Sequence, residues 1–259
     1  MTFDLVVATL GRVDELGRFL RSLERQTHRA FRVLVVDQNE DDRIEPLLTE
    51  RIVRFHSPPG LSRARNEALP HLHADVVAFP DDDCVYPDDL LERVAARLEG
   101  LDGITGREPW WTADAAVLRR DNLWNRAISF TIFLRREVVE RVGSFDERLG
   151  LPSSSGEEID YLIRALDTGA RIEYDPSLVV EHPRKQVDPR AAGARDGASV
   201  GYLLRKHRYP ARTVVRMLAR PLAGAVVDPR RAGFHLATFR GRLRGYRGKQ
   251  LGVPVEPRP

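Results

Sequence analysis

Short apolar runs alternate with helical periodicity along the first hundred residues of the chain. The runs predict strands over residues 3–8, 31–36, 52–55 and 76–79; the first run is typical of a strand buried on both faces, and the run over 52–55 is the weakest. Between them, apolar residues recur every three or four positions, which predicts helices over residues 16–23, 62–69 and 90–98. Because strands and helices alternate, we expect a mostly parallel sheet flanked by helices.

The pattern is less regular in the rest of the chain. It predicts a turn-rich break over residues 100–106, a strand over 128–134 and a helix over 136–142 that stops at Gly143. A flexible loop over 149–156, a helix over 159–166 and a late strand over 178–180 follow. Beyond Arg190, apolar residues and arginines form helix-like patches, and Pro254, Pro257 and Pro259 predict a disordered end.

Composition narrows the class of protein. The 259 residues suffice for one large or two small domains with a hydrophobic core. The single cysteine, Cys84, excludes a disulfide framework within the chain and fits a reducing compartment. The N-terminus shows no signal-peptide pattern, and no apolar run reaches the roughly 18 residues of a membrane-spanning helix. We therefore expect a cytoplasmic protein.

Charge is distributed unevenly along the chain. Residues 190–259 contain 16 Lys and Arg against 3 Asp and Glu, a net charge of +13. Residues 1–189 contain 25 Lys and Arg against 35 Asp and Glu, a net charge of −10. This asymmetry indicates an anionic partner for the C-terminal segment: a membrane surface, nucleic acid or another acidic surface. The acidic excess of residues 1–189 argues against nucleic acid as the partner of most of the chain.

Asp81, Asp82 and Asp83 directly follow the predicted strand at residues 76–79. Three adjacent carboxylates repel one another unless a cation lies near them, and a divalent metal is the simplest such cation. A metal at a strand end of an α/β sheet suggests an enzyme that handles a diphosphate. The alternative is a solvated acidic turn before the next helix.

Further motifs occur in a fixed order along the chain. They are Val7–Ala8–Thr9 with Arg12, Val35–Val36–Asp37, residues 60–69, the aspartate triplet, residues 142–147, residues 156–160 and His182. In this order they resemble the family 2 glycosyltransferases of the GT-A fold, over residues 3–185. The resemblance implies an α/β fold with a Rossmann-like, mixed but mostly parallel sheet flanked by helices.

The resemblance and the composition together predict the domain organisation. Residues 1–105 would form the nucleotide-sugar-binding half of the core, and residues 106–189 its acceptor-binding and catalytic half. Residues 190–259 would form a basic, mainly helical C-terminal extension.

The resemblance also implies a site for inverting, metal-dependent sugar transfer from a nucleoside-diphosphate sugar. The metal ligands would be Asp81, Asp83 and His182, around Mn2+ or Mg2+, and manganese tolerates imidazole better. The expected nucleotide-sugar-binding residues are Thr9, Arg12, Asp37, Arg63, Arg65, Asn66, Asp81 and Asp82.

Two of these expectations are more specific. Asp37 would contact the base, although the Asp37–Gln38–Asn39 sequence departs from the small-residue turn of relatives and leaves the nucleotide open. Arg63 and Arg65 would contact the diphosphate at a helix N-terminus. The structural alternatives are a turn-capping aspartate and a solvated helix face.

An inverting transfer needs a general base near the acceptor hydroxyl. The resemblance gives this role to the second residue of an acidic pair, here Glu158, with Glu157 as the second candidate. The alternative is that both glutamates only favour the positive end of a helix. Trp110, Trp111 and Asp160 are candidates for acceptor contact, against core packing for the tryptophans and a structural role for Asp160.

The expected partners follow from this assignment. The donor would be of the UDP or dTDP type, and the acceptor a saccharide or a lipid-linked saccharide. The basic extension fits peripheral attachment to the inner face of an anionic membrane, and no nucleic acid is expected. Three alternatives remain: a nucleotidyltransferase, a catalytically inactive nucleotide-sugar-binding relative, and a protein that binds nucleic acid or an anionic surface through its basic tail.

Overall fold

The computed structural model describes residues 1–111, 113–150, 155–183 and 187–248. Contacts within the chain divide it into two units. The first unit comprises residues 1–145 and 161–183, and the second comprises residues 146–160 and 184–259. The segment 151–154 of the predicted flexible loop and the predicted disordered end lie outside the described residues.

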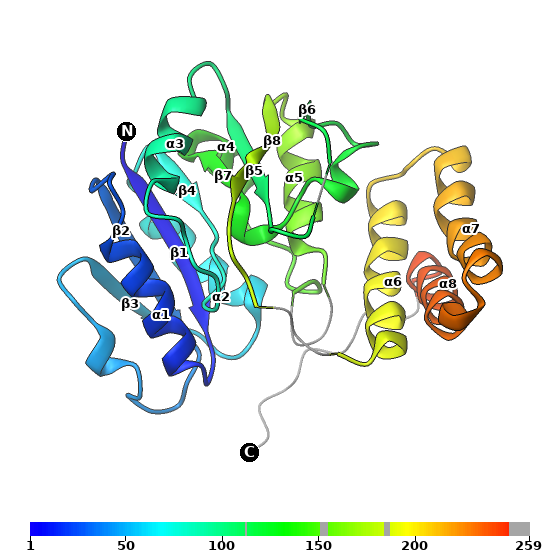
Figure 1. Ribbon diagram of the computed structural model, residues 1–259, viewed down its shortest axis with the longest axis horizontal. Coiled ribbons are helices and arrows are strands. Elements are labelled where there is room, and N and C mark those ends of the chain that lie inside the picture. Colours follow the sequence, from blue (N-terminus) through cyan, green and yellow to red (C-terminus); the bar gives the residue numbers. More distant parts are fainter. Residues whose placement is uncertain (112, 151–154, 184–186, 249–259) are drawn as a thin grey trace. The chain divides into compact units, whose positions relative to one another are not determined.

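The first unit is built on a mixed eight-stranded sheet (Figure 1). Its strands are β1 (Phe3–Thr9), β2 (Phe31–Asp37), β3 (Ile52–His56), β4 (Val76–Ala78), β5 (Gly103–Arg107), β6 (Ala116–Val117), β7 (Phe133–Arg135) and β8 (Ile172–Val179). The spatial order is β3-β2-β1-β4-β7-β5-β8-β6. β1 pairs in parallel with β2 and β4, β2 with β3, and β5 with β8, whereas β7 and β6 pair antiparallel with their neighbours. The predicted mostly parallel α/β sheet is confirmed.

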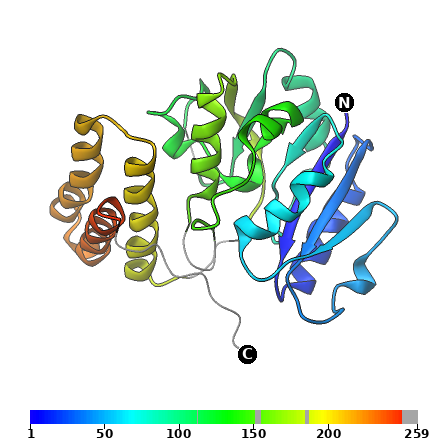
Figure 2. The same ribbon diagram turned by 180° about the vertical axis from the view of Figure 1, so that it is seen from behind.

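Helices cover both faces of this sheet, as Figures 1 and 2 show. They are α1 (Val13–Glu24), α2 (Leu61–Ala68), α3 (Leu90–Arg97) and α4 (Arg136–Val142). α1 and α3 lie on one face, where Leu16 and Val94 join Leu5 and Val7 of the sheet in one buried cluster. α2 and α4 lie on the opposite face (Figure 2). Burial on both faces explains the continuous valine runs of β1 and β2.

The turn-rich break predicted over residues 100–106 is wrong, because β5 occupies most of it. Its glycines permit close strand packing instead of a turn. A Cβ on Gly106 would lie 2.2 Å from the carbonyl oxygen of Leu178, and a Cβ on Gly103 would lie 3.0 Å from that of Phe133. The late strand β8 also begins earlier than residue 178, at Ile172, and runs through Pro176.

The other predicted elements of this region need smaller corrections. The strand predicted over residues 128–134 is reduced to β7, because a 3-10 turn occupies Ser129–Thr131. The helix that ends before Gly143 is confirmed as α4. The helix predicted over residues 159–166 is confirmed as α5 (Glu157–Asp167), which begins two residues earlier.

Three further helices, α6 (Pro189–Lys206), α7 (Ala211–Val227) and α8 (Ala232–Tyr246), lie in the second unit. Glycines let α6 and α8 pack backbone to backbone. A Cβ on Gly201 of α6 would lie 2.0 Å from the carbonyl oxygen of Arg242, and a Cβ on Gly245 of α8 would lie 1.9 Å from that of Ala198. Within the described residues, no helix is both long enough and apolar enough to cross a bilayer.

A proline inside α7 explains how this helix is attached to α8. Pro221 has no N–H to donate to the carbonyl of Met217 four residues earlier. The guanidinium of Arg242 on α8 donates to that carbonyl instead. Burial lowers the pKa of Arg242, and the nearby Arg220 acts in the same direction. α7 and α8 are therefore joined at the position where the proline interrupts the helix.

We expect Gly201→Ala to destabilise the second unit by about 2 kcal/mol, because the added methyl group overlaps the backbone of α8. Gly17→Ala is the matched control in a helix. Its Cβ would lie 3.3 Å from the flexible end of Arg21, so the substitution should be neutral or stabilise by up to about 1 kcal/mol. Thermal denaturation followed by circular dichroism measures both. Equal effects of the two substitutions would contradict this description of the α6–α8 packing.

Candidate functional site

The aspartate triplet lies at the carboxyl edge of the sheet. Asp81 forms an isolated parallel bridge with Ala8, which continues the pairing of β4 with β1. This pairing brings the end of β1 beside the triplet, and the Thr9 hydroxyl donates to Asp82 Oδ2 over 2.9 Å. Two predicted site residues from distant parts of the sequence are thus in direct contact.

Arg12 connects two carboxylates of the triplet. It stands immediately before α1, and its Nη1 donates to Asp82 Oδ1 at 2.9 Å and to Asp83 Oδ2 at 3.1 Å. Asp82 and Asp83 are both buried. Burial raises the pKa of Asp82 to about 6, although Arg12 acts in the opposite direction. The guanidinium therefore offsets part of the cost of collecting negative charge here.

His182 reaches the triplet from the far end of the unit's sequence. An antiparallel bridge between Val85 and Glu181 brings the segment after β8 beside the triplet. The imidazole stacks on Phe130, with 4.7 Å between ring centroids and 5° between planes. Its Nε2 lies 3.0 Å from Asp83 Oδ1 and 3.9 Å from Asp81 Oδ2.

These three side chains fit a divalent cation. One ligand atom each from Asp81, Asp83 and His182 lies within 4.8 Å of the others. Although Asp83 Oδ1 lies 3.0 Å from the buried Nε2 of His182, this nitrogen forms no hydrogen bond within the described part of the chain. A buried nitrogen of this kind, facing two carboxylates, is suited to coordinate a metal ion. The same three residues were predicted as metal ligands from the resemblance, and the fold brings them together.

Asp81 has two further polar neighbours. Arg65 of α2 is 1% exposed, and its Nη2 donates to Asp81 Oδ1 over 3.4 Å. The Ser129 hydroxyl donates to the same oxygen over 3.3 Å. The Arg65 guanidinium also lies over the rings of Phe79 and Phe145, at 5.8 and 5.5 Å from their centroids. Arg65 thus places a buried positive charge beside the triplet.

Three consecutive polar residues, Asp37 at the end of β2 and Gln38 and Asn39 after it, each hold another segment of the chain. Asp37 Oδ2 accepts from Arg54 Nη2 at 2.7 Å, while its Oδ1 accepts from the backbone N–H of Asn39 at 3.0 Å. Gln38 accepts from the backbone N–H of Gly60 at 2.6 Å, and Asn39 from that of Gly11 at 2.7 Å. This arrangement is a structural reason for the unusual turn sequence. A contact of Asp37 with a base stays a prediction, and both of its oxygens already accept hydrogen bonds.

Two predicted site residues, Asn66 and Arg63, lie on α2. Asn66 binds the backbone of Phe145 in both directions, accepting from its N–H at 2.7 Å and donating to its carbonyl at 3.1 Å. The Asn66 amide therefore has a structural use, and its contact with a nucleotide sugar stays a prediction. Arg63 is half-buried on the same helix.

The predicted acceptor-contacting tryptophans are not equivalent. Trp110 is 42% exposed, whereas Trp111 is half-buried and its Nε1 donates to the carbonyl of Asn125 at 2.6 Å. Trp124 also donates to a backbone carbonyl, that of Arg120, at 3.1 Å. Trp110 therefore offers an exposed ring, and the other two anchor their own loop.

In the second unit, Glu157 and Glu158 are the first two residues of α5. The predicted helix over residues 159–166 had placed both glutamates before its start. The helix begins directly after Gly156, whose φ of +88° suits glycine. Glu157 is buried and Glu158 half-buried. Their place in the first turn exposes both carboxylates to the positive end of the helix dipole.

Asp160 belongs to a buried charge network of the second unit. It is fully buried, and its Oδ1 lies 2.6 Å from Lys206 Nζ and 2.8 Å from His207 Nε2. Lys206 also donates to Asp146 at 2.8 Å, and Tyr202 donates to Asp146 at 2.6 Å. Although burial alone would raise it, hydrogen bonds from Arg148, Lys206 and Tyr202 lower the pKa of Asp146. The network fixes the end of α6 to the start of α5, and acceptor contact by Asp160 stays a prediction.

Sequence reasoning missed three residues beside the candidate site: Arg54, Ser129 and Phe130. Arg54 comes from the weakest of the predicted strands, and the segment of Ser129 and Phe130 was predicted as part of a strand. None belongs to a recognisable motif. Their proximity arises only from the folded arrangement of the strands.

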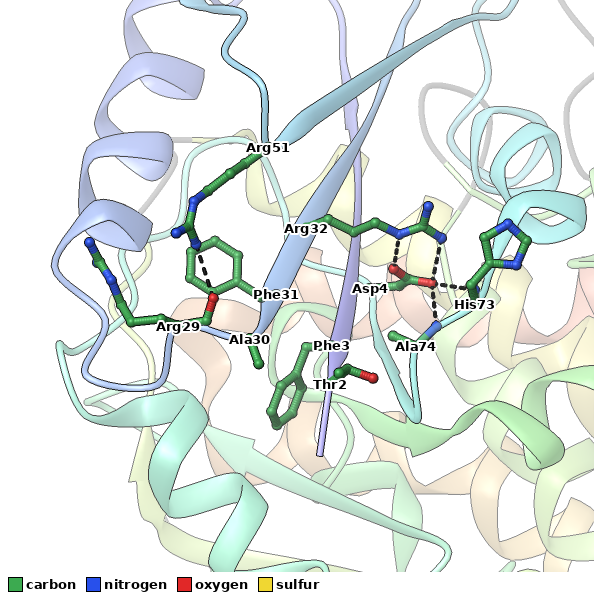
Figure 3. Close-up of a pocket in the computed structure, with 10 residues that line it drawn as sticks. All are labelled: Thr2, Phe3, Asp4, Arg29, Ala30, Phe31, Arg32, Arg51, His73 and Ala74. Atoms are coloured by element: carbon green, nitrogen blue, oxygen red, sulfur yellow. Dashed lines mark hydrogen bonds and ion pairs between the residues drawn. The ribbon is translucent and has the colours of Figure 1, made fainter.

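A separate pocket of about 540 Å³ opens at the amino ends of β1 and β2 (Figure 3). Its Asp4 pairs with Arg32 and accepts from the backbone N–H groups of His73 and Ala74 at 2.7 and 3.0 Å. Arg51 lies over the ring of Phe31, at 5.4 Å from its centroid. The aspartate triplet lies at the carboxyl ends of β1 and β4, whereas this pocket lies at the amino ends of β1 and β2, so the pocket is not part of the candidate site.

Comparisons with known proteins agree with one another. The family model described as Glycosyl transferase family 2 matches residues 4–143. A pre-mycofactocin glycosyltransferase of Mycobacterium tuberculosis is 25% identical over 209 residues, which cover 70% of this chain and 42% of that protein. The succinoglycan biosynthesis protein ExoM of Rhizobium meliloti is 26% identical over 247 residues, which cover 85% of this chain and 76% of that protein. The chain spans less than half the length of the Mycobacterium relative.

Solved structures share the fold at low sequence identity. The mannosyltransferase PcManGT from Pyrobaculum calidifontis, in complex with GDP-Man and Mn2+, superposes with a TM-score of 0.69 at 15% identity, covering 96% of this chain and 88% of that one. S. aureus TarS 1–349, in complex with UDP-GlcNAc, superposes with a TM-score of 0.62 at 16% identity, covering 99% and 95%.

Proposed function

Because this chain belongs to glycosyltransferase family 2, we propose that it transfers a sugar from a nucleoside-diphosphate sugar to a hydroxyl group of a saccharide or lipid-linked acceptor. The observation that carries this proposal is the cluster of Asp81, Asp83 and His182 at the carboxyl edge of the sheet. Ligands of α/β sheets bind at this edge. Two fold neighbours with nucleotide sugars, PcManGT and TarS, support the same donor class.

Asp81, Asp83 and His182 would hold Mn2+ or Mg2+. A bound divalent cation would neutralise negative charge on the diphosphate leaving group. The imidazole nitrogen favours manganese, because magnesium prefers oxygen ligands. The Mn2+ present with PcManGT supports this choice.

Residues around the metal ligands would position the donor. Thr9 and Arg12 hold Asp82 and Asp83 in place through the hydrogen bonds described above. Arg65 and Arg63 supply positive charge for the diphosphate from α2. Asp37 would contact the base of a UDP- or dTDP-type donor.

Glu158 is the proposed general base of an inverting transfer, with Glu157 as the second candidate. A carboxylate would accept the proton of the acceptor hydroxyl while the hydroxyl oxygen attacks the anomeric carbon and the bond to the diphosphate breaks. Trp110 offers an exposed indole on which an acceptor sugar can stack.

The test is product formation with a panel of UDP-, dTDP- and GDP-sugars, Mn2+ and mixed saccharide acceptors. We expect release of a nucleoside diphosphate and a mass increase of one sugar on an acceptor. Release of pyrophosphate from nucleoside triphosphate and sugar phosphate would instead identify a nucleotidyltransferase. Donor binding without any transfer across the panel would identify an inactive relative and overturn the proposal.

A further inference from the structure

Exposed apolar side chains gather on two helices of the second unit. Of the eleven exposed large apolar side chains in the described part of the chain, five lie on α7 and α8. Val226 and Val227 are 80% and 84% exposed, and Val215 is 66% exposed. Leu222 and Leu236 are 39% and 41% exposed. Exposed apolar residues that lie singly are ordinary, but several such residues close together on one helix are typical of an interaction surface.

The apolar residues of α7 form a stripe along the helix. Val215, Leu222 and Val226 recur at spacings of seven and four residues, so they share one side of the helix. This side is distinct from the buried face of α7, which carries Val214 and Pro221. Arg242 fixes α7 on α8 through the carbonyl of Met217, so the stripe is held in a defined orientation within the unit.

Exposed arginines lie beside the stripe on α7 and also occur in the segment that follows it. On α7, Arg212, Arg216 and Arg220 recur every four residues, and all three are exposed. Further exposed arginines lie in the following turn, at positions 230 and 231, on α8, at positions 240 and 244, and directly after α8, at position 247. Residues 211–247 contain nine arginines and one acidic residue, Asp228, which gives this segment a net charge of +8.

We infer that the exposed α7 surface, defined by Val215, Leu222, Val226 and Val227 and by the exposed arginines of the same helix, docks on an anionic lipid bilayer. The arginines would pair with lipid phosphates, and the valines and leucines would enter the boundary of the acyl chains. Long arginine side chains can keep their guanidinium groups at the headgroups while their stems cover apolar surface. The inference is independent of the proposed transferase activity.

Charge and apolarity together favour a bilayer over other partners. Nucleic acid would satisfy the arginines but would leave two valines at least 80% exposed without a use. A second copy of this chain would cover the valines but would bring together two segments that each carry a net charge of +8. An anionic bilayer satisfies both requirements.

The test uses the full chain in co-sedimentation with phosphatidylcholine vesicles, with and without phosphatidylglycerol. We expect binding only to the anionic vesicles, and weaker binding as the salt concentration rises. Val226→Ser with Val227→Ser preserves charge and should weaken binding by about tenfold or more. Arg216→Gln with Arg220→Gln should weaken it through charge alone. Val187→Ser, at a 55% exposed valine elsewhere in the unit, is the control and should bind as the unmodified chain does.

Several results would overturn the inference. One is the absence of binding to anionic vesicles; another is binding that the double serine variant leaves unchanged, which would reduce the surface to a charge effect. Tighter binding to RNA or DNA than to vesicles would identify nucleic acid as the partner. A dimer in light scattering that the double serine variant disrupts would identify a second copy. Circular dichroism checks that each variant is folded, and sugar transfer in the absence of vesicles is measured separately.

Discussion

We expect Asp83→Asn to lower sugar transfer by about 100-fold or more and to remove its dependence on Mn2+. The substitution preserves the size of the side chain but removes one charged metal ligand from the set of Asp81, Asp83 and His182. It also weakens the attraction to Arg12, which lies 3.1 Å from Asp83. The measurement is the initial rate of nucleoside diphosphate release at several Mn2+ concentrations.

Asp89→Asn is the matched control for this prediction. Asp89 is an exposed carboxylate six residues further along the chain, and its ion pair with Arg93 is long, at 3.9 Å. We expect its substitution to leave both the rate and the Mn2+ dependence unchanged, because exposed ion pairs contribute little. Full activity of Asp83→Asn at low Mn2+ would rule out Asp83 as a metal ligand.

We expect Glu158→Gln to lower the rate constant of transfer by about 1,000-fold while leaving donor binding nearly unchanged. A glutamine side chain has the same shape but cannot accept the proton of the acceptor hydroxyl, and general bases contribute about 100- to 10,000-fold. The measurement is kcat and the KM for donor, supported by donor binding to the variant. A rise in KM alone would indicate a binding role instead.

Two further glutamates make this prediction decisive. Glu137 is exposed and is the second residue of α4, as Glu158 is of α5, so Glu137→Gln controls for loss of a first-turn carboxylate. We expect it to retain full activity. Glu157→Gln separates the two candidates for the base. A large loss of kcat in Glu157→Gln, with none in Glu158→Gln, would assign the base to Glu157.

The parallel part of the sheet was predictable because its signal is local. Strands buried on both faces need continuous apolar runs, and β1 and β2 have them. β5 was missed because Gly103 and Gly106 are also typical of turns. Their actual reason, close approach to Phe133 and Leu178, depends on strands that follow much later in the sequence. Close backbone packing therefore cannot be distinguished from a turn by composition.

The candidate site likewise contains residues that the sequence predicts and residues that only the fold identifies. The aspartate triplet and His182 were predicted from the sequence, and the fold places them together. Phe130, which stacks on His182, and Ser129, which donates to Asp81, carry no local signal. Their role follows from tertiary proximity alone.

The polar turn after β2 shows a different limit. Its sequence indicated a departure from relatives but did not show which contacts the polar side chains make. Asp37, Gln38 and Asn39 each hold another segment, so their side chains are fixed by contacts with Arg54, Gly60 and Gly11. A sequence taken alone does not pair residues that lie far apart along the chain.

The most direct measurement is thermal stabilisation by UDP, dTDP and GDP, each with Mn2+, with Mg2+ and with a chelator. A ligand that binds only the folded state raises the denaturation midpoint. We predict a metal-dependent rise with one nucleotide, retained in Asp89→Asn and lost in Asp83→Asn. If no nucleotide stabilises the protein at millimolar concentration, or if stabilisation persists in the chelator, the claim that this carboxylate–histidine cluster binds a metal–diphosphate donor is wrong.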